Sequence, residues 1–173
     1  MAEEPKSVGD ISFMKVREGD LIQLAIKGYF DVIVHGCNCQ CKMGAGIAKA
    51  IKEAFPEAYE KDLTTIKGSV EKLGSISWVE VNRDELKIIV VNGYTQLDWK
   101  GKGVKLDYDA IRIVMKNVRQ CFSGKRIGYP LIGAGLAGGD WNKIAKIIDE
   151  ELSGEDHTLV KFVNQTSLNS FSN

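Results

Sequence analysis

The sequence of 173 residues contains little proline, histidine or cysteine, with three, two and four residues respectively. So few cysteines do not make a disulfide scaffold, and a chain of this length can bury a hydrophobic core without metal ions or disulfides. An excess of charge is also lacking, because 23 basic residues balance 23 acidic ones. Without a global positive field we expect no nucleic-acid partner. The composition therefore predicts one globular domain over residues 1–173, which we expect to be a monomer.

Long apolar runs are absent too, and no segment approaches the length needed to cross a membrane. Met1–Pro5 lacks the basic and apolar regions with which a signal peptide begins. We therefore expect a cytoplasmic protein without a membrane partner. The polar ends, residues 1–10 and 164–173, are expected to be loose.

Three of the four cysteines, Cys37, Cys39 and Cys41, alternate along the chain, and Cys121 lies far away in a helical pattern. Zinc sites usually space their ligands as Cys-x-x-Cys with a second pair elsewhere, and this chain has no such pair. In a reducing cytoplasm, buried free thiols that pack as small apolar residues are the better interpretation. We therefore expect no metal site.

Runs rich in β-branched residues alternate with amphipathic stretches, a pattern typical of an α/β fold. Strands are predicted at 11–16, 31–35, 76–81, 86–92, 126–130 and 157–163. Helices are predicted at 44–55, 57–66, 107–124 and 141–152. For residues 21–26 the periodicity fits either a strand or a short helix. The last strand, which carries His157, is expected on the outside of the sheet.

The segment from His35 to Ala48 organises the sequence, because it follows a predicted strand and opens a helix. At this place the first backbone N–H groups of the helix are free and the positive end of its dipole is exposed. Gly44 and Gly46 let a phosphate approach the backbone, since a side chain there would hold it away. The segment is therefore a candidate pyrophosphate site.

Two further loops follow predicted strands. Residues 130–141 are rich in glycine, and Asp140 stands where the N-cap of the next helix belongs. Residues 93–103 are glycine-rich, basic and aromatic, and they form either a ligand loop or an ordinary surface loop. Open α/β sheets place their ligands at the carboxyl ends of the strands. We therefore expect the two glycine loops to face each other across one cleft.

In their order along the chain, these motifs resemble those of the macro domain family. The strand-end Asn motif of that family corresponds to residues 35–38, its first phosphate loop to 43–48, its phosphate-and-ribose loop to 130–141, and its adenine-side motif to Gly19-Asp20-Leu21. The resemblance covers residues 12–163 and implies a three-layer α/β/α macro domain with a central mixed, mostly parallel sheet. The run from His35 to Cys39 most resembles ADP-ribose-1''-phosphate phosphatases of the yeast type and small phage-encoded macro proteins, and a phage protein would act in the host cytoplasm.

The resemblance implies a phosphatase that hydrolyses ADP-ribose-1''-phosphate to ADP-ribose and phosphate, with no cofactor. Two alternatives stay open: a non-catalytic reader or sponge of ADP-ribose, and an ADP-ribosyl hydrolase or deacylase that acts on modified macromolecules. The ligand-binding residues that the resemblance implies are Gly19, Asp20, Leu21, Gly36, Cys37, Asn38, Met43, Gly44, Ala45, Gly46, Ile47, Ala48, Thr95, Ile132, Gly133, Ala134, Gly135, Leu136 and Ala137.

The candidate catalytic residues are His35, Asn38 and Asp140. By itself His35 fits a partly buried histidine, but the yeast-type resemblance makes it the leading candidate to activate water or protonate the departing oxygen. Asn38 caps its loop, contacts the distal ribose, or does both. Asp140 is a helix cap, a catalytic base, or both. Asp20 likewise hydrogen-bonds its own turn or accepts from the amine of adenine.

Two positions depart from the macro enzymes that remove ADP-ribose from protein through a lysine adduct. By a loose alignment Gln96 stands at the position of their lysine, and Ala137 stands at that of their aspartate. Without an amine nucleophile we do not expect that covalent mechanism. A positioned water can instead attack a phosphate monoester.

Overall fold

A computed structural model of the chain describes residues 13–163. Its elements are β1 (Lys15–Gly19), α1 (Leu21–Ile26), β2 (Val32–Asn38), α2 (Gly46–Ala54), α3 (Pro56–Leu63), the 3-10 helix η1 (Val70–Lys72), β3 (Ile76–Arg83), β4 (Leu86–Gln96), α4 (Tyr108–Phe122), β5 (Ile127–Tyr129), α5 (Trp141–Glu151) and β6 (His157–Phe162). The predicted loose ends, 1–10 and 164–173, lie outside the described residues, as do residues 11–12 of the predicted first strand.

The six strands form one sheet in the order β1-β6-β5-β2-β4-β3. Every neighbouring pair is parallel except β3 and β4, which form an antiparallel hairpin. This is the mixed, mostly parallel sheet that the family resemblance implied, and it is confirmed. Parallel neighbours place their carboxyl ends at the same edge, so the loops after β5, β2 and β4 leave the sheet side by side.

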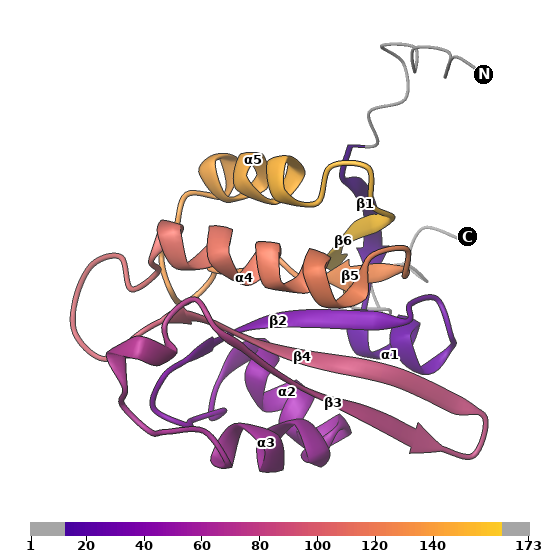
Figure 1. Cartoon of the computed structure of the whole chain (residues 1–173), viewed down its shortest axis with the longest axis horizontal. Helices are drawn as coiled ribbons and strands as arrows, with labels where there is room; N and C mark the ends of the chain where they lie inside the picture. The colour runs from indigo at the N-terminus through magenta and orange to yellow at the C-terminus, as the bar shows by residue number, and fades with distance from the viewer. Residues whose placement is uncertain (1–12, 164–173) are drawn as a thin grey trace, which may run out of the picture.

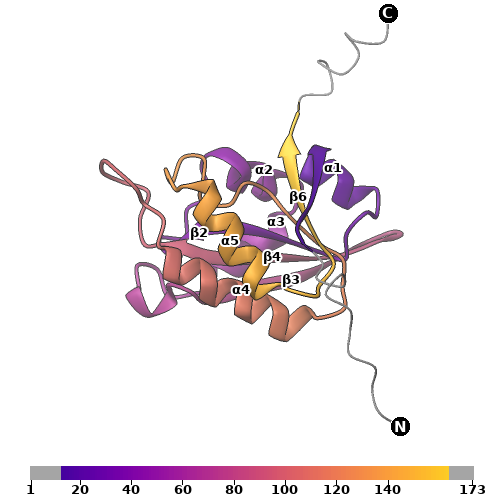
Figure 2. The same cartoon turned by 90° about the horizontal axis from the view of Figure 1, so that it is seen from above.

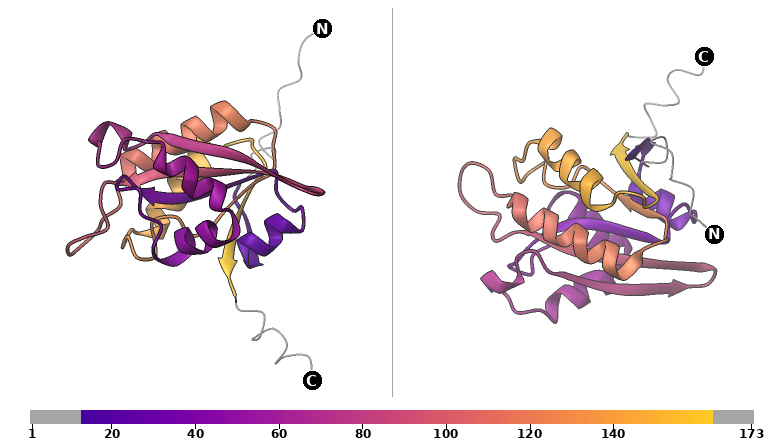
Figure 3. Two further views of the ribbon diagram at one scale, coloured as in Figure 1. Left: turned by 90° about the horizontal axis from the view of Figure 1, so that it is seen from below. Right: turned by 45° about the horizontal axis from the view of Figure 1, so that its top comes forward.

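Helices cover both faces of the sheet and make three layers (Figure 1). Helices α4 and α5 lie on one face, as the view from above shows (Figure 2), and α1, α2 and α3 lie on the other, as the view from below shows (Figure 3, left). Two hydrophobic clusters fill the spaces between these layers. Along β2 the side chains alternate between them, because Val34 packs on the α4–α5 side and Ile33 on the α1–α3 side.

Several boundaries differ from the predicted ones. β4 continues to Gln96, four residues beyond the predicted strand, because β2 pairs with it along that length and β3 pairs with it as far as Gly93. Residues 21–26 are helical, and the Asp20 carboxylate caps them by accepting from the Ile22 and Gln23 amides. The first strand spans Lys15–Gly19, later than predicted, since its register with β6 begins at Lys15.

Two further predictions were wrong. β6 is not an outer strand, because it lies between β1 and β5, and His157 on it is fully buried. Cys121 is exposed, whereas Cys37, Cys39 and Cys41 are buried free thiols as predicted. Among the helices of residues 13–163, none is both long and apolar enough to span a bilayer.

Candidate functional site

Three loops meet at the carboxyl ends of β5, β2 and β4, toward the left of Figure 1. The loop after β2 is residues 39–45, the loop after β5 is residues 130–140, and the loop after β4 is residues 97–107. The first two are the predicted phosphate loops and are called here the first and second glycine loops. Their geometry decides what this edge of the sheet can bind.

The first glycine loop presents the open amino end of α2. Ala45 is the N-cap of this helix, and its side chain makes no capping hydrogen bond. The amides of Gly46, Ile47 and Ala48 have no acceptor within the helix, because an α-helix satisfies its amides only from the fourth onward. Gly46 has a φ of +58°, which favours glycine and turns the chain into the helix. Helices α1, α4 and α5, by contrast, are each capped by an aspartate.

The second glycine loop folds back on itself and leaves consecutive amides unused. The Gly139 amide donates to the Gly133 carbonyl at 2.7 Å, and the Gly138 amide donates to Gly135 at 3.1 Å. Within residues 13–163, the amides of Gly135, Leu136 and Ala137 have no hydrogen-bond acceptor. Successive free amides of this kind form a concave nest that attracts anions.

The two glycine loops lie against each other. A Cβ atom on Gly46 would be 3.6 Å from Cδ1 of Leu136, so the side chain of the second loop reaches the start of α2. The loop after β4 supports this arrangement, because the Lys105 amide donates to the Ala137 carbonyl at 2.8 Å. The two glycine loops are therefore neighbours at one edge of the sheet, and the cleft that the sequence predicted between them stays a prediction.

Asn38 shapes the first glycine loop from within. Its side-chain nitrogen donates to the Lys42 carbonyl at 2.9 Å, and its oxygen accepts from the Gln40 amide at 2.9 Å. These bonds are the capping role that the sequence left open for Asn38. One N–H of the side-chain amide stays available for a ligand, since an amide nitrogen carries two donors.

Several predicted ligand residues are buried, so only their backbone atoms can reach a ligand at the loops. Cys37 and Met43 pack with Cys39 and Tyr94 in a small hydrophobic cluster under the first glycine loop. On the other side of β2, Gly36 allows close packing, because a Cβ there would lie 2.9 Å from the Thr95 hydroxyl oxygen. The exposed positions are Gly44, Ala45, Gly46, Gly135 and Leu136.

His35 does not lie on the glycine-loop surface. Its side chain is 1% exposed and points to the α3 side of the sheet, where its Nε2 donates to Asn92 Oδ1 at 2.7 Å. The direction follows from Asn92, whose amide nitrogen already donates to the Ala58 carbonyl. Burial lowers the pKa of His35, and the bond to Asn92 opposes that shift only in part. The imidazole is therefore neutral and enclosed, which corrects the expectation that it contacts the reacting group.

A chain of buried hydrogen bonds continues from His35 and was not predicted. Asn92 donates to Ser77, and the Ser77 hydroxyl lies 2.7 Å from that of Tyr94. The Tyr94 hydroxyl donates to Asp62 at 2.8 Å, and the ammonium of Lys72 lies 3.6 Å from the same carboxylate. The members of this buried network are His35, Asp62, Lys72, Ser77, Asn92 and Tyr94. Sequence reasoning missed it because its members come from five separate segments.

Asp20 and Asp140 both cap helices at the same edge of the sheet. The Asp20 carboxylate serves α1, and Asp140 Oδ1 accepts from the Asn142 amide at 3.0 Å. The Asp140 amide donates to the hydroxyl of Tyr108, which fixes the end of the second glycine loop against α4. The capping prediction for Asp140 is confirmed, Asp20 hydrogen-bonds the backbone that follows it as one of its two interpretations had it, and each aspartate keeps a second carboxylate oxygen. In the part of the chain that the structure describes, no three His, Cys, Asp or Glu side chains are grouped to hold a metal ion.

Comparison with known proteins identifies the fold. The Macro domain family model matches residues 34–148. An uncharacterised 17.5 kDa protein of Enterobacteria phage T4 is 36% identical over 141 residues, which cover 79% of this chain and 88% of that protein. The macrodomain of Mycobacterium tuberculosis DarG has a TM-score of 0.66 at 19% identity, covering 87% of this chain and 99% of its own.

A third similar protein is Thermosipho africanus DarTG, solved in complex with ADP-ribose. Its TM-score is 0.62 at 15% identity, and the match covers 87% of this chain and 42% of that one. At these identities the structural likenesses show the fold, while the family model and the phage protein show the relationship by sequence. The chain belongs to the macro domain family.

Proposed function

We propose that the two glycine loops bind ADP-ribose and that the protein hydrolyses ADP-ribose-1''-phosphate to ADP-ribose and phosphate. The observation that carries the proposal is the presence of free amides on two neighbouring loops, at the start of α2 and at residues 135–137. A diphosphate spans two such groups, and each amide is a donor fixed before the ligand arrives. The ADP-ribose found with the Thermosipho protein, which has this fold, supports the choice of ligand.

The adenine end is assigned to Asp20, at the carboxyl end of β1. One oxygen of its carboxylate is used by the Ile22 and Gln23 amides, and the other can accept from the exocyclic amine. The distal ribose is assigned to the free N–H of Asn38. These assignments keep the ligand along one edge of the sheet, from the end of β1 to the end of β2.

For the reaction, the 1''-phosphate lies beside the second glycine loop, whose amide dipoles offset the charge that builds up as water attacks. Asp140 is the candidate base, because it is the only titratable side chain in residues 130–141 and it is exposed. His35 takes no direct part in this scheme, since Asn92 holds it inside the protein. Water attacks the phosphorus and the ribose oxygen leaves, so no covalent enzyme intermediate is required.

A second candidate is binding without catalysis. The enclosed position of His35 and the capping duty of Asp140 favour it, because neither side chain is dedicated to proton transfer at the loops. Hydrolysis of ADP-ribose from a modified macromolecule would instead release ADP-ribose and no phosphate.

The test is to incubate the protein with ADP-ribose-1''-phosphate and to follow inorganic phosphate, with Asp140→Asn as the matched variant. Asparagine is as good an N-cap as aspartate but cannot accept a proton, so the variant should fold normally and lose most of its turnover. ADP-ribose should also raise the melting temperature more than AMP does, because both glycine loops must be engaged together. Tight ADP-ribose binding with no phosphate release would assign the reader function.

A further inference from the structure

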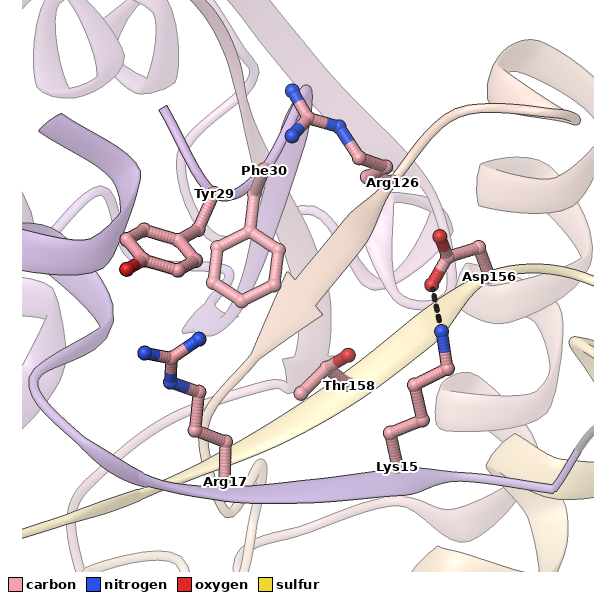
Figure 4. Close-up of a pocket in the computed structure, with 7 residues that line it drawn as sticks. All are labelled: Lys15, Arg17, Tyr29, Phe30, Arg126, Asp156 and Thr158. Atoms are coloured by element: carbon pink, nitrogen blue, oxygen red, sulfur yellow. Dashed lines mark hydrogen bonds and ion pairs between the residues drawn. The ribbon is translucent and has the colours of Figure 1, made fainter. Parts of the chain in front are cut away.

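A cavity lies near the amino ends of the strands, away from the glycine loops. Its volume is about 160 Å³, roughly five times the share of one water molecule in the liquid. The seven lining residues are Lys15, Arg17, Tyr29, Phe30, Arg126, Asp156 and Thr158, and Figure 4 shows their side chains. It belongs to the α1–α3 face of the sheet, because Thr158 is two residues from Val160 on β6 and so shares its face, and Val160 packs on that side.

The register of three strands creates this hollow. Lys15 on β1 and Gly128 on β5 are both register partners of Thr158 on β6, so the three positions form one row across the sheet. Gly128 has no side chain, and the ring of Phe30 occupies the space above it, since a Cβ there would be 2.8 Å from the ring. Across the sheet, this row therefore presents the ammonium of Lys15, the hydroxyl of Thr158 and the aromatic ring of Phe30.

The charges around the cavity are not balanced. Lys15 pairs with Asp156 at 3.1 Å, and Arg126 pairs with Asp31 at 2.9 Å. Arg17 has no carboxylate partner within residues 13–163, and its guanidinium lies 4.2 Å above the centre of the Tyr29 ring. Because the whole chain is neutral, this surplus positive charge is a local feature.

Free hydrogen-bond donors accompany that charge. The Thr158 hydroxyl has no hydrogen-bond partner among the described residues, and in Figure 4 it lies between Arg17 and Lys15. The ring contact orients the Arg17 guanidinium without using its N–H donors. The one lining carboxylate, Asp156, is held by Lys15 on the far side from Arg17.

We propose that this cavity binds a phosphate group, either as the free ion or as the end of a small phosphomonoester such as a pentose phosphate. A planar guanidinium offers two parallel donors to phosphate oxygens, and a hydroxyl and an ammonium beside it supply further donors. Tyr29 and Phe30 provide an apolar wall for the carbon skeleton of such a ligand. The proposal is independent of the function assigned to the glycine loops, because it uses other residues and the other end of the sheet.

The test is a residue-resolved NMR titration of the full chain with ribose 5-phosphate and, separately, with inorganic phosphate. Both titrations are run with and without saturating ADP-ribose, so that the glycine loops are blocked in one arm. With either ligand, and both with and without ADP-ribose, we expect saturable chemical-shift changes centred on Arg17, Phe30 and Thr158. Tighter binding of ribose 5-phosphate would identify a phosphomonoester as the ligand, and equal binding would identify the phosphate ion.

Three variants locate the binding. Arg17→Gln should weaken it about tenfold or more, and Thr158→Val should weaken it severalfold, as expected when a charged or a neutral hydrogen bond is removed. Lys87→Gln is the control, because it removes the same charge from an exposed pair with Glu80 on another part of the sheet and should change nothing. All three positions are partly or fully exposed, and a melting curve checks that each variant is folded.

The proposal is overturned if the shifts fall only on the glycine loops, or if Arg17→Gln behaves like Lys87→Gln. It is also overturned if neither phosphate ligand shifts the cavity residues at all. Should Arg17→Gln fail to fold, Thr158→Val decides the matter, because it keeps the size of the side chain. Failure of ADP-ribose to bind would appear separately, at the glycine loops, and would leave the cavity result intact.

Discussion

A buried region and an exposed region at the carboxyl end of β2 differ in whether their polar groups have hydrogen-bond partners. On the α3 side, the buried network from His35 to Lys72 gives each member a partner inside the protein. On the exposed surface of the glycine loops, the amides of residues 135–137 and the first amides of α2 have none among the described residues. Buried polar groups need hydrogen-bond partners inside the protein for the chain to fold, whereas exposed groups are hydrated and remain available to a ligand.

Whether a polar group has a hydrogen-bond partner inside the protein distinguishes structural groups from candidate ligand-binding groups better than residue type does. A histidine is the side chain most often chosen for acid–base chemistry, yet His35 is committed to Asn92. The two thiols of the first glycine loop, Cys39 and Cys41, are buried, yet the backbone of both loops presents free donors. The predictions that follow test whether the buried network is purely structural and whether the free amides are the functional part.

The largest effect is expected from Asp62→Ala. The variant leaves the ammonium of Lys72, whose side chain is 5% exposed, without its carboxylate. Breaking a buried pair in this way costs about 3–5 kcal/mol of unfolding free energy. Urea denaturation measures it, with Glu80→Ala as the control, since that removes an exposed pair with Lys87 worth about 0–1 kcal/mol. Equal losses in the two variants would show that the network is not a stability element.

The next effect concerns the free amides and uses Gly46→Val. Valine strains the φ of +58° and fills the space in front of Leu136, which keeps phosphates from the amides. At a ligand concentration of 100 Kd the parent protein should gain about 2.7 kcal/mol from ADP-ribose, and the variant none. Gly28→Val is the matched control, because its φ is +85° and open space surrounds it. A full ligand effect in Gly46→Val would remove the first glycine loop from the site.

A smaller effect is expected from His35→Gln, which loses the present bond to Asn92. Leaving the buried side-chain oxygen of Asn92 poorly paired should cost about 1–3 kcal/mol of unfolding free energy. ADP-ribose affinity and phosphate release per folded molecule should stay nearly unchanged. Turnover that falls by orders of magnitude in a well-folded variant would return His35 to the mechanism.

The same residue predicts a pH dependence. Burial lowers the pKa of His35 in the folded state, so the unfolded chain takes up the proton first as pH falls. Stability is therefore full above the unfolded pKa of about 6.5 and declines as pH drops from there toward the folded pKa. Burial also lowers the pKa of His157, which acts in the same direction. Urea melts at pH 7.5 and 5.5 should show a smaller decline in His35→Gln than in the parent, and an equal decline would mean that the pKa of His35 is not lowered in the folded state.

The smallest effect is expected from Asp20→Ala, which removes the cap of α1. Loss of an aspartate N-cap costs about 1 kcal/mol of stability. Asp107→Ala is the control, because Asp107 caps α4 by accepting from the Ala110 amide. Both variants should lose similar stability, but only Asp20→Ala should weaken ADP-ribose binding, measured by calorimetry. Equal affinities in the two variants would leave Asp20 as a helix cap alone.

The sequence by itself determined the layers of the fold and the place of the glycine loops. β-branched runs such as residues 88–91 and the apolar stripe of α4 follow local periodicity, which short-range sterics and burial impose. Glycine at position 46 and aspartate at positions 107 and 140 likewise mark turns and caps, which depend on neighbouring residues only. The strand ends were less well defined, because Gly93–Gln96 gain their pairing from β2 and β3.

Only the tertiary structure decided the direction of His35 and the partners of Asp62 and Lys72. The alternation of a strand says that His35 and Gly36 face opposite sides, but not which side meets the second glycine loop and which meets α3. The burial of His157 was decided in the same way, by the position of β6 between two other strands. The cavity beside Arg17 also depends on a row across β1, β6 and β5, whose members are far apart in the chain. Such groups acquire their chemistry from neighbours that long-range strand pairing and helix packing bring to them, and local sequence carries no record of those neighbours.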